Sequence, residues 1–321
     1  MAILMRIRGC AAVAAALMAT GCDLVREPTV IDSLEHPATV HAILRAGDDT
    51  VRVLISRARA LRDFDVVPVT GAEVWIHGPS GPVALRETGP GMGACTGGVP
   101  VSPAESPGDA EGAGCYIGVL PAAVRSGERY GLRITLPSGE LVVGETHVPM
   151  PPTVSANSAS RLVLRTGPDG WVDPPVVRMM WSRGPDAAAL EFDVGLGVAY
   201  AGDDVVPGAW CVVSASSYPF LTYPFATRDP AGEIELRVYS ASCQVMPDPT
   251  EPGRVETVHW DSVSVTVHVA AADTAYRDYV ENRFENVRPW PRASAGLEGA
   301  VGVFGAVAVT EIPLMIVRES R

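Results

Sequence analysis

Residues 262–269 read Ser-Val-Ser-Val-Thr-Val-His-Val, an unbroken alternation of polar and β-branched apolar side chains. Because successive side chains of a strand point to opposite faces, this stretch predicts a strand with one buried face and one polar face. The same period of two recurs in residues 51–56, 71–76, 130–135 and 233–238. Short alternating strands separated by Gly, Pro and Asp turns are typical of antiparallel sandwiches, so we expect an all-β protein.

The composition supports this interpretation. The 321 residues include 32 Gly and 28 Pro, which favour turns and short strands over long helices. The chain is long enough for two domains of ordinary size. Its formal net charge is −12, and removing the two positive charges of Arg6 and Arg8 makes it −14. Since an acidic body repels the phosphates of nucleic acids, we expect no nucleic-acid partner.

The first 22 residues predict an export signal. Two arginines precede a short apolar run over residues 9–18, and Ala-Thr-Gly-Cys follows at 19–22. The run is shorter than the roughly 20 apolar residues that cross a bilayer, and its flanks are those of a signal peptide. The last four residues resemble the lipobox of bacterial lipoproteins, in which Cys22 becomes the lipidated first residue of the mature chain. The alternative is an ordinary secretory signal cut near Ala19.

Lipidation at Cys22 predicts a soluble body attached to a bilayer, because each buried methylene of the acyl chains contributes about 0.8 kcal/mol. We expect residues 1–21 to be removed and the protein to be anchored in the outer membrane, on its periplasmic face or at the cell surface. Asp23 directly follows the cysteine. In some enteric bacteria that residue resembles a signal for retention in the inner membrane, which leaves the choice of membrane open.

Residues 149–152 read Pro-Met-Pro-Pro, and consecutive prolines stiffen a linker and lack backbone donors. This linker divides the expected mature chain into a tether over 22–37, an N-terminal β-sandwich over 38–148 and a C-terminal β-rich domain over 153–321. We expect two β-sandwich domains, the first of them immunoglobulin-like or carboxypeptidase-regulatory-like.

One helix is expected, near the end of the second domain. Asp273 can cap it, since its side-chain oxygen would accept a free amide of the first turn. Pro289 would end it. We interpret this segment as a helix packed on the edge of a sheet, with a partner-binding helix as the alternative. The apolar residues that recur at roughly helical spacing are Tyr276, Tyr279, Val280, Phe284 and Val287.

Four cysteines belong to the expected body of the protein: Cys95, Cys115, Cys211 and Cys243. An even number in an exported chain indicates disulfides, and four cysteines allow three pairings. We favour Cys95–Cys115 and Cys211–Cys243, because each pair stays within one expected domain. Closing a loop of about 20 residues in this way contributes roughly 3 kcal/mol. A zinc site is the rival interpretation, although the cysteines lack Cys-x-x-Cys spacing.

Two segments are candidates for contact with other molecules. Residues 89–114 are rich in Gly, Pro, Ser and Ala, and we interpret them as a mobile surface insertion, with a binding loop as the alternative. Residues 218–225 place four aromatic residues among prolines, which is poor material for a strand and is typical of an exposed apolar patch. The alternative is packing over the loop between the second cysteine pair. The residues of this candidate contact patch are Tyr218, Phe220, Tyr223 and Phe225.

Motifs of catalysis and metal binding are missing from the sequence. No Gly-x-Ser-x-Gly elbow, His-Glu-x-x-His pair or phosphate-binding loop occurs. The acidic pairs at 48–49 and 203–204 lie in expected turns, where calcium would need further oxygen ligands. We therefore expect no enzymatic activity, no cofactor and no bound metal. A hydrolase whose catalytic triad is assembled in space is the weakest alternative.

Several short motifs occur in an order that resembles a known family: Val-Thr-Gly-Ala-Glu-Val-Trp-Ile at 69–76, Leu-Arg-Glu at 85–87, Cys-Tyr at 115–116, Gly-Glu-Arg-Tyr-Gly-Leu at 127–132 and, after the expected helix, Gly-Ala-Val-Gly-Val-Phe-Gly-Ala at 299–306. Over nearly all of the mature chain this order is similar to the domain-of-unknown-function family 4249. Its members are exported lipoproteins of Gram-negative bacteria, often encoded beside TonB-dependent outer-membrane receptors. The first half also resembles carboxypeptidase-regulatory-like and transthyretin-like sandwiches. The resemblance transfers no catalytic residue.

The resemblance and the lipobox together imply a non-enzymatic outer-membrane lipoprotein that is an accessory or ligand-binding partner of a TonB-dependent transporter. An adhesion or structural lipoprotein of the envelope, with the sandwiches as a stalk, is the alternative. The expected partners are the lipid bilayer, through acylated Cys22, and a TonB-dependent receptor.

Replacing the cysteine of the lipobox tests the anchor. In Cys22→Ala the acyl chains have no thiol to join, so we expect the protein to move from the membrane fraction to the soluble envelope fraction. Cell fractionation followed by immunoblotting measures this. Cys10→Ala is the control and should stay membrane-bound, because Cys10 leaves with the signal. Retention of Cys22→Ala in the membrane would contradict lipidation at this residue.

Overall fold

The computed structural model describes residues 38–58, 66–88, 95, 114–156, 161–166, 172–195, 197–202, 204–207, 209–218, 225–245, 256–285 and 294–319. The expected signal, the lipobox cysteine and the tether lie outside these residues. Within the described part of the chain, no helix is both long enough and apolar enough to cross a membrane.

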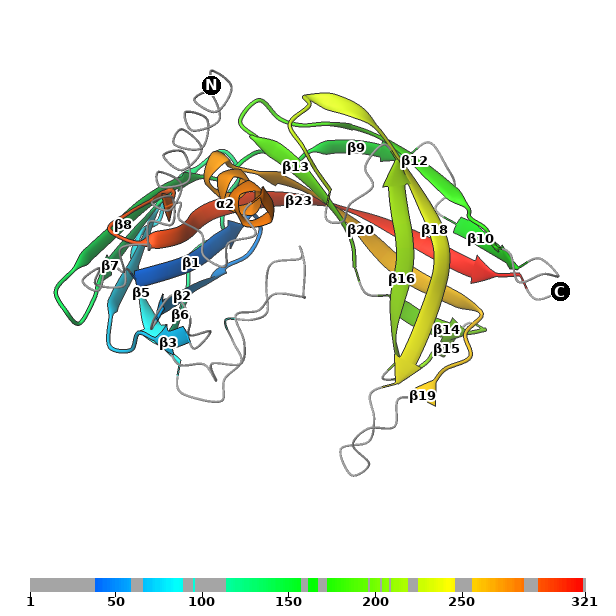
Figure 1. The fold of residues 1–321 in the computed structure, drawn as a ribbon, viewed down its shortest axis with the longest axis horizontal. Helices are drawn as coiled ribbons and strands as arrows, with labels where there is room; N and C mark the ends of the chain where they lie inside the picture. Colours follow the sequence, from blue (N-terminus) through cyan, green and yellow to red (C-terminus); the bar gives the residue numbers. More distant parts are fainter. Residues whose placement is uncertain are drawn as a thin grey trace, which may run out of the picture. The chain divides into compact units, whose positions relative to one another are not determined.

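The longest strand, β23 (Val301–Arg318), runs through both halves of the fold (Figure 1). Its first part pairs in parallel with β1 (Ala38–Arg45). From Val307 to Val317 it pairs antiparallel with β20 (Ser262–Ala272). At about 3.3 Å per residue, a strand of 18 residues extends roughly 60 Å, which is enough to serve two successive sandwiches.

We call the sheet around β23 the shared sheet. Its main strands follow the order β6 (Cys115–Val119), β2 (Thr50–Ala58), β1, β23, β20, β13 (Ala189–Val194) and β17 (Phe225–Thr227). Shorter strands extend it: β3 (Val66–Pro68) on β2, β10 (Arg161–Thr166) and β21 (Ser294–Ala295) on β23, β11 (Val172–Asp173) on β10, β14 (Val198–Ala201) on β20, and β15 (Asp204–Val205) on β14.

Two outer sheets complete the sandwiches. The first outer sheet has the antiparallel order β5 (Gly81–Glu87), β4 (Glu73–Gly78), β7 (Arg129–Thr135), β8 (Leu141–His147) and β22 (Leu297–Glu298). The second outer sheet has the order β16 (Ala209–Tyr218), β18 (Ala231–Val245), β12 (Val176–Ser182) and β9 (Thr153–Ala156), with β19 (Glu256–Thr257) on β18. The predicted all-β class with two sandwiches is confirmed.

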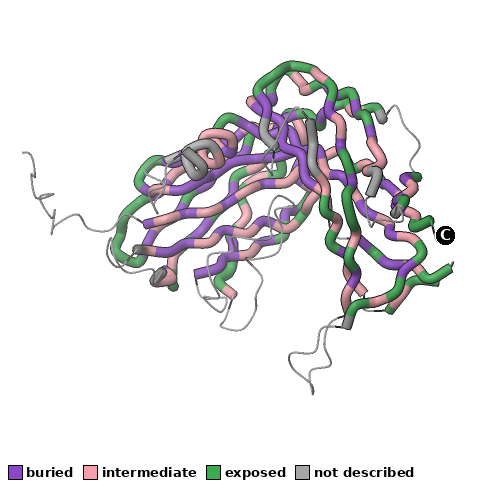
Figure 2. Tube along the Cα trace, turned by 45° about the vertical axis from the view of Figure 1, so that its right-hand side comes forward, coloured by how far each residue is buried: buried purple, intermediate pink, exposed green. Residues whose placement is uncertain are grey.

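The first sandwich closes over one apolar core. Alternate residues of β1 and β2 are buried, and they meet alternate residues of β4 and β7, such as Ile76 and Ile134. From β23, the fully buried ring of Phe304 fills the same core. Buried and more exposed residues alternate along many strands, as a period of two requires (Figure 2). Burial of each such side chain contributes about 1.5–3 kcal/mol relative to exposure.

The second sandwich buries the valine face of residues 262–269, the pattern from which the fold was predicted. Opposite these valines lie Met179 of β12 and Ile234 and Leu236 of β18. β23 reaches this core as well, through Leu314 and Ile316. The strand periodicities in both halves are therefore confirmed.

One strand thus belongs to two cores, which the predicted domain division did not include. Residues 149–152 lie between β8 and β9, as a linker would. However, β22 and β23 return from the end of the chain to pair with β8 and β1. The first core is therefore completed by residues far outside 38–148, and Pro37–Arg321 cluster as one unit. The division into two contiguous domains stays a prediction.

A helix, α2 (Thr274–Glu285), lies against β23 on the face of the shared sheet away from the two cores. Ala272, Tyr276 and Val307 form a small apolar cluster at this contact. Because β23 is paired on both sides, the helix covers a sheet face, and the expectation that it lies at a sheet edge is wrong. The helix ends at Glu285, and the expected stop at Pro289 lies outside the described residues.

Two glycines of β23 let other parts of the backbone approach it. Gly302 has a φ of +110°, and a Cβ there would overlap the carbonyl oxygen of Val40 in β1. A Cβ at Gly305 would lie 2.9 Å from the backbone nitrogen of Tyr276 and 2.9 Å from its Cβ. The missing side chains therefore allow β1 and the first turn of α2 to lie directly against this strand.

The close approach at Gly302 predicts a large effect of adding one methyl group. We expect Gly302→Ala to lower the free energy of unfolding by about 3 kcal/mol or more, because it combines a positive φ with a clash against β1. Gly139→Ala is the matched control, since Gly139 has a φ of +88° but no atom within 4 Å of a Cβ there. It should cost only about 1–2 kcal/mol. Urea unfolding measures both, and equal losses would contradict a tight β1–β23 contact.

Candidate functional site

Both disulfides favoured from the sequence are present, Cys95–Cys115 and Cys211–Cys243. Cys115 begins β6. The second pair joins the neighbouring strands β16 and β18, in which its two residues are register partners. With their sulfur atoms joined in this way, the four cysteines do not form the rival zinc site. Two disulfides are typical of proteins from oxidising compartments.

The candidate contact patch is described only in part. Tyr218 ends β16 and Phe225 begins β17, and of these two residues the structure describes the backbone alone. Phe220 and Tyr223 lie outside the described residues, as does most of the 89–114 insertion. The register places Tyr218 opposite Glu235 of β18. The patch stays a prediction, and its first residue adjoins a surface that the structure does describe.

That surface is the outward face of the second outer sheet. Glu235 accepts a hydrogen bond from Arg178 Nε at 2.9 Å and pairs with Arg237 Nη2 at 3.2 Å. On the same face, Met180 and Val212 are 51% and 46% exposed. We call these five residues the outward surface. Met180 lies two residues from Arg178, whereas Val212, the register partner of Ser242, lies farther along the sheet. An exposed methionine beside arginines is a combination found at protein interfaces, where Met and Arg are enriched.

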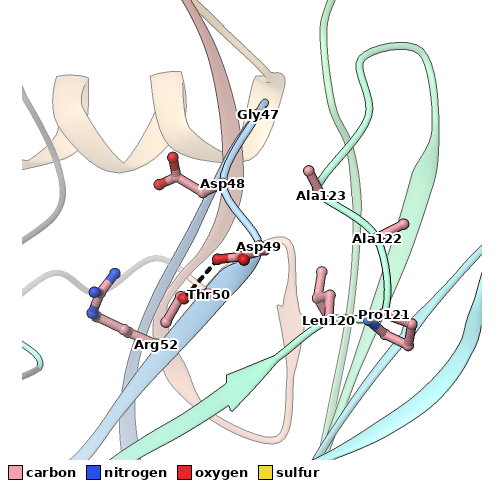
Figure 3. A pocket seen from close by; sticks show the side chains of 9 residues that line it. All are labelled: Gly47, Asp48, Asp49, Thr50, Arg52, Leu120, Pro121, Ala122 and Ala123. Atoms are coloured by element: carbon pink, nitrogen blue, oxygen red, sulfur yellow. Dashed lines mark hydrogen bonds between the residues drawn. The ribbon is translucent and has the colours of Figure 1, made fainter.

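A hollow of about 560 Å³ lies on the other sandwich, between the β1–β2 turn and the segment that follows β6 (Figure 3). Asp48, Asp49 and Arg52 give it charges of both signs, and the Thr50 hydroxyl donates to Asp49 Oδ1 at 2.9 Å. The segment from Leu120 to Ala123 forms the facing wall (Figure 3). Small-molecule sites are predominantly apolar, whereas this hollow is mostly polar, so its lining alone indicates no ligand.

Calcium at the two acidic pairs stays a weak alternative. Asp48 and Asp49 lie at the hollow, while Asp203 lies outside the described residues. Among the residues that the structure describes, no three His, Cys, Asp or Glu side chains come together as metal ligands would. Calcium needs six to eight oxygen ligands, which two adjacent aspartates do not supply.

The most unusual groups are two buried carboxyls beside α2. Glu191 and Asp193 of β13 are two residues apart and so share one face of the strand, where they are only 4% and 5% exposed. In register, Glu191 lies beside Ala270 and Asp193 beside His268 of β20. Glu191 is hydrogen-bonded to the side chain of Tyr276 in α2. Its Oε2 atom is buried and has no hydrogen-bond partner within the described chain.

Burial is the main cause of the raised pKa values of these two carboxyl groups. Burial raises the pKa of Glu191 to about 8; the hydrogen bond with Tyr276 opposes this rise and the charge of Asp193 adds to it. Burial likewise raises the pKa of Asp193 to about 6, although the amide of Val194 stabilises its charged form. At pH 7, therefore, Glu191 holds its proton and Asp193 is mostly ionised. Strongly shifted pKa values of this kind cluster at functional sites.

A third buried carboxyl, Asp273, fixes the start of α2, as its position in the sequence predicted. Its Oδ1 accepts the backbone N–H of Tyr276 at 2.8 Å, and its Oδ2 accepts the hydroxyl of Thr146 from β8 at 2.5 Å. Its own backbone N–H donates to Ala306 of β23 at 3.0 Å. Burial raises the pKa of Asp273, and the hydrogen bonds oppose that rise. One residue thereby connects the helix, the first outer sheet and the shared sheet.

The charges continue across the shared sheet from Asp193 to His268 and Glu311, which are register partners on three neighbouring strands. Glu311 Oε1 accepts from Arg45 Nη2 at 2.8 Å and lies 3.9 Å from His268 Nε2. The other ring nitrogen, Nδ1, is buried without a hydrogen-bond partner in the described part, and burial lowers the pKa of this histidine. Among the residues that the structure describes, no serine or cysteine is hydrogen-bonded to either nitrogen, so this row shows no nucleophile–base pair of the kind found in hydrolases.

Glu191 and Asp193 were not recognisable as candidate site residues from the sequence. In the strand Ala-Leu-Glu-Phe-Asp-Val the acids occupy alternate positions, which is the pattern of a strand with one solvated face. The structure instead places α2 over this part of the shared sheet. The one sequence signal for their burial was the expected helix, because a helix with an apolar Tyr276 must pack on some face of a sheet and bury the residues of that face.

The shared sheet, its two sandwiches and the two disulfides define the class of the protein: a disulfide-bonded double β-sandwich. Residues 27–167 match the family model described as Domain of unknown function (DUF4249). The family predicted from the motifs is thereby confirmed from β1 to the end of β10. The likeness beyond residue 167 stays a prediction. A comparison with curated proteins gave no match.

The contacts of Asp273 predict that its side chain supports more than the helix. We expect Asp273→Ala to lower the free energy of unfolding by about 2–4 kcal/mol, because it removes a cap and leaves the buried Thr146 hydroxyl without its partner. Asp278→Ala, in the same helix, is the control. That side chain is 43% exposed and pairs with its neighbour Arg277, so its removal should cost less than about 1 kcal/mol. Urea unfolding compares the two, and similar losses would contradict the bracing role of Asp273.

Proposed function

We propose that this protein is a non-enzymatic lipoprotein, anchored through Cys22, that docks on a TonB-dependent transporter of the outer membrane and assists the uptake of its ligand. The lipobox supports the anchor, and the two disulfides support a location in the oxidising envelope. The family match over residues 27–167 supports the class of transporter, through the resemblance described above.

The observation that carries the docking role is the outward surface. Met180 and Val212 expose apolar area on it, and Arg178 and Arg237 flank the Glu235 carboxylate. The aromatic segment 218–225 begins at the same strand, opposite Glu235. Aromatic, methionine and arginine side chains contribute most of the energy of many protein interfaces. The rigid sheet beneath these residues holds them in one arrangement before a partner binds, which limits the entropy lost on binding.

An affinity experiment tests this function. The tagged, lipidated full-length protein is recovered from envelope solubilised in mild detergent, and its partners are identified by mass spectrometry. We expect a TonB-dependent receptor to be enriched. Met180→Glu should lower that enrichment about tenfold, since one residue at an interface centre often contributes 1–2 kcal/mol or more.

Leu141→Glu is the matched control, because Leu141 is similarly exposed, at 47%, but belongs to the first outer sheet. It should leave receptor recovery unchanged. Recovery of the wild-type protein without a receptor would contradict the docking role, and binding to whole cells in that case would favour the adhesion alternative. Equal losses in the two variants would place the contact elsewhere on the molecule.

A further inference from the structure

The contact between α2 and the shared sheet includes a hydrogen bond to a buried carboxyl group. Tyr276, in the first turn of the helix, is 4% exposed and is hydrogen-bonded to Glu191 of β13, which is equally buried. Gly305 brings the backbone of this turn directly onto β23. Moving the first turn of α2 away from the sheet would therefore break both the close backbone contact at Gly305 and the Tyr276–Glu191 hydrogen bond.

The surroundings of Glu191 favour its neutral form. One carboxyl oxygen atom, Oε2, is buried with no hydrogen-bond partner in the described part of the chain, so an ionised group would carry uncompensated charge there. The nearest acidic neighbour on its own strand, Asp193, shares the same face and is also buried. A second charge beside the first is repelled by it in a medium of low dielectric constant.

Among the residues that the structure describes, the other elements around this face place no cation in an ion pair with Glu191. On β20, His268 is neutral at pH 7 because burial lowers its pKa. Between β20 and α2, Asp273 is a further acidic group. On β23 and β1, Glu311 and Arg45 pair with each other.

The aromatic groups complete the surroundings. On α2, burial raises the pKa of both Tyr276 and Tyr279, so both hydroxyls stay neutral in the physiological range. The ring of Tyr279 meets that of His41 from β1 edge-on, with 5.7 Å between the ring centroids.

We propose that the docking of α2 on the shared sheet is a proton-linked switch, in which the buried carboxyl of Glu191 keeps the helix in place while protonated and favours its release once ionised. When α2 is released, Glu191 becomes hydrated and ionises readily, which stabilises the released state as pH rises. The inference is independent of the proposed docking partner, because it concerns a contact within this chain.

The sign of the pH dependence follows from the two protonation equilibria. The pKa of Glu191 is about 8 in the docked state and near its ordinary value of 4.5 when hydrated. The docked state therefore binds more protons, and docking weakens as pH rises between these values. Above about 8 both states are ionised, and the dependence levels off. Asp193, with a pKa of about 6, contributes mainly below that pH.

Hydrogen–deuterium exchange of the full-length protein in detergent tests the switch. The readout is the protection factor of amides in α2, which corrects for the pH dependence of intrinsic exchange. One linked proton changes an equilibrium about tenfold per pH unit. We therefore expect α2 protection to fall about tenfold from pH 6.5 to 7.5 and to level off above pH 8, while protection in β7 stays constant. Constant α2 protection in the wild-type protein, or an equal fall in β7, would overturn the proposal.

Variants assign the proton to one side chain. Glu191→Gln keeps a neutral hydrogen-bonding group and should make α2 protection independent of pH from 6.5 to 7.5. Glu311→Gln is the matched control on the same sheet face and should keep the wild-type slope. Tyr276→Phe removes the hydrogen bond that lowers the pKa of Glu191, so the levelling should move to higher pH. An unchanged slope in Glu191→Gln, or an unmoved levelling point in Tyr276→Phe, would overturn the assignment.

Discussion

The pairing of β23 on both of its sides is the constraint on which the rest of the structure depends. β1 lies on one side in parallel and β20 on the other in antiparallel orientation. A strand that is hydrogen-bonded on both sides has fixed faces, because a slip of one residue would reverse every side chain. That register places Phe304 in one core and Leu314 in the other, and it presents Gly302 and Gly305 where neighbouring backbone must approach. The two sandwiches are therefore mechanically coupled through a single element.

The same sheet has a second face, and its chemistry differs from that of the cores. Around Val307 the face is apolar and carries α2, whereas towards β13 it holds Glu191 and Asp193. Burying carboxyls costs free energy unless they are paired or protonated. Asp273 meets this requirement with hydrogen bonds from Thr146 and from the helix, but Glu191 keeps an oxygen without a partner. The start of α2 is consequently held by two carboxyl groups. Asp273, which caps the helix, has its hydrogen bonds satisfied, whereas Glu191, which bonds to Tyr276, is costly to bury.

Local patterns predicted the parts of this fold that local physics determines. The alternation in 51–56, 130–135 and 262–269 identified the buried faces, because side-chain direction in a strand depends only on parity. Asp273 was recognisable as a cap because a cap binds an amide only three residues away. The disulfides followed from the number of cysteines and from their proximity in the chain. The motifs at 69–76 and 115–116 correspond to a real contact: the Tyr116 hydroxyl accepts the amide of Ala72 at 2.9 Å and donates to the carbonyl of Val69 at 2.9 Å.

What the sequence did not reveal is the choice of partner between distant segments. Nothing near Thr39 indicates that it pairs with Val301, and the prolines at 149–152 pointed to a boundary that β22 and β23 cross. The buried carboxyls were missed for the same reason. Glu191 has the spacing of a solvent-facing acid, and only the position of α2, set by tertiary packing, gives it a different environment.

The position of β23 at the end of the described chain also has a kinetic consequence. β1 and β23 are far apart in the sequence, so the first core lacks Phe304, and β1 lacks one of its two neighbours, until these two strands meet. Contacts between such distant segments are slow to form, because a long loop must close first. Until then, the unpaired edge of β1 is open to pairing with other chains, and a chaperone that shields this edge would protect the protein from aggregation. The risk of aggregation therefore depends on how soon β23 pairs with β1.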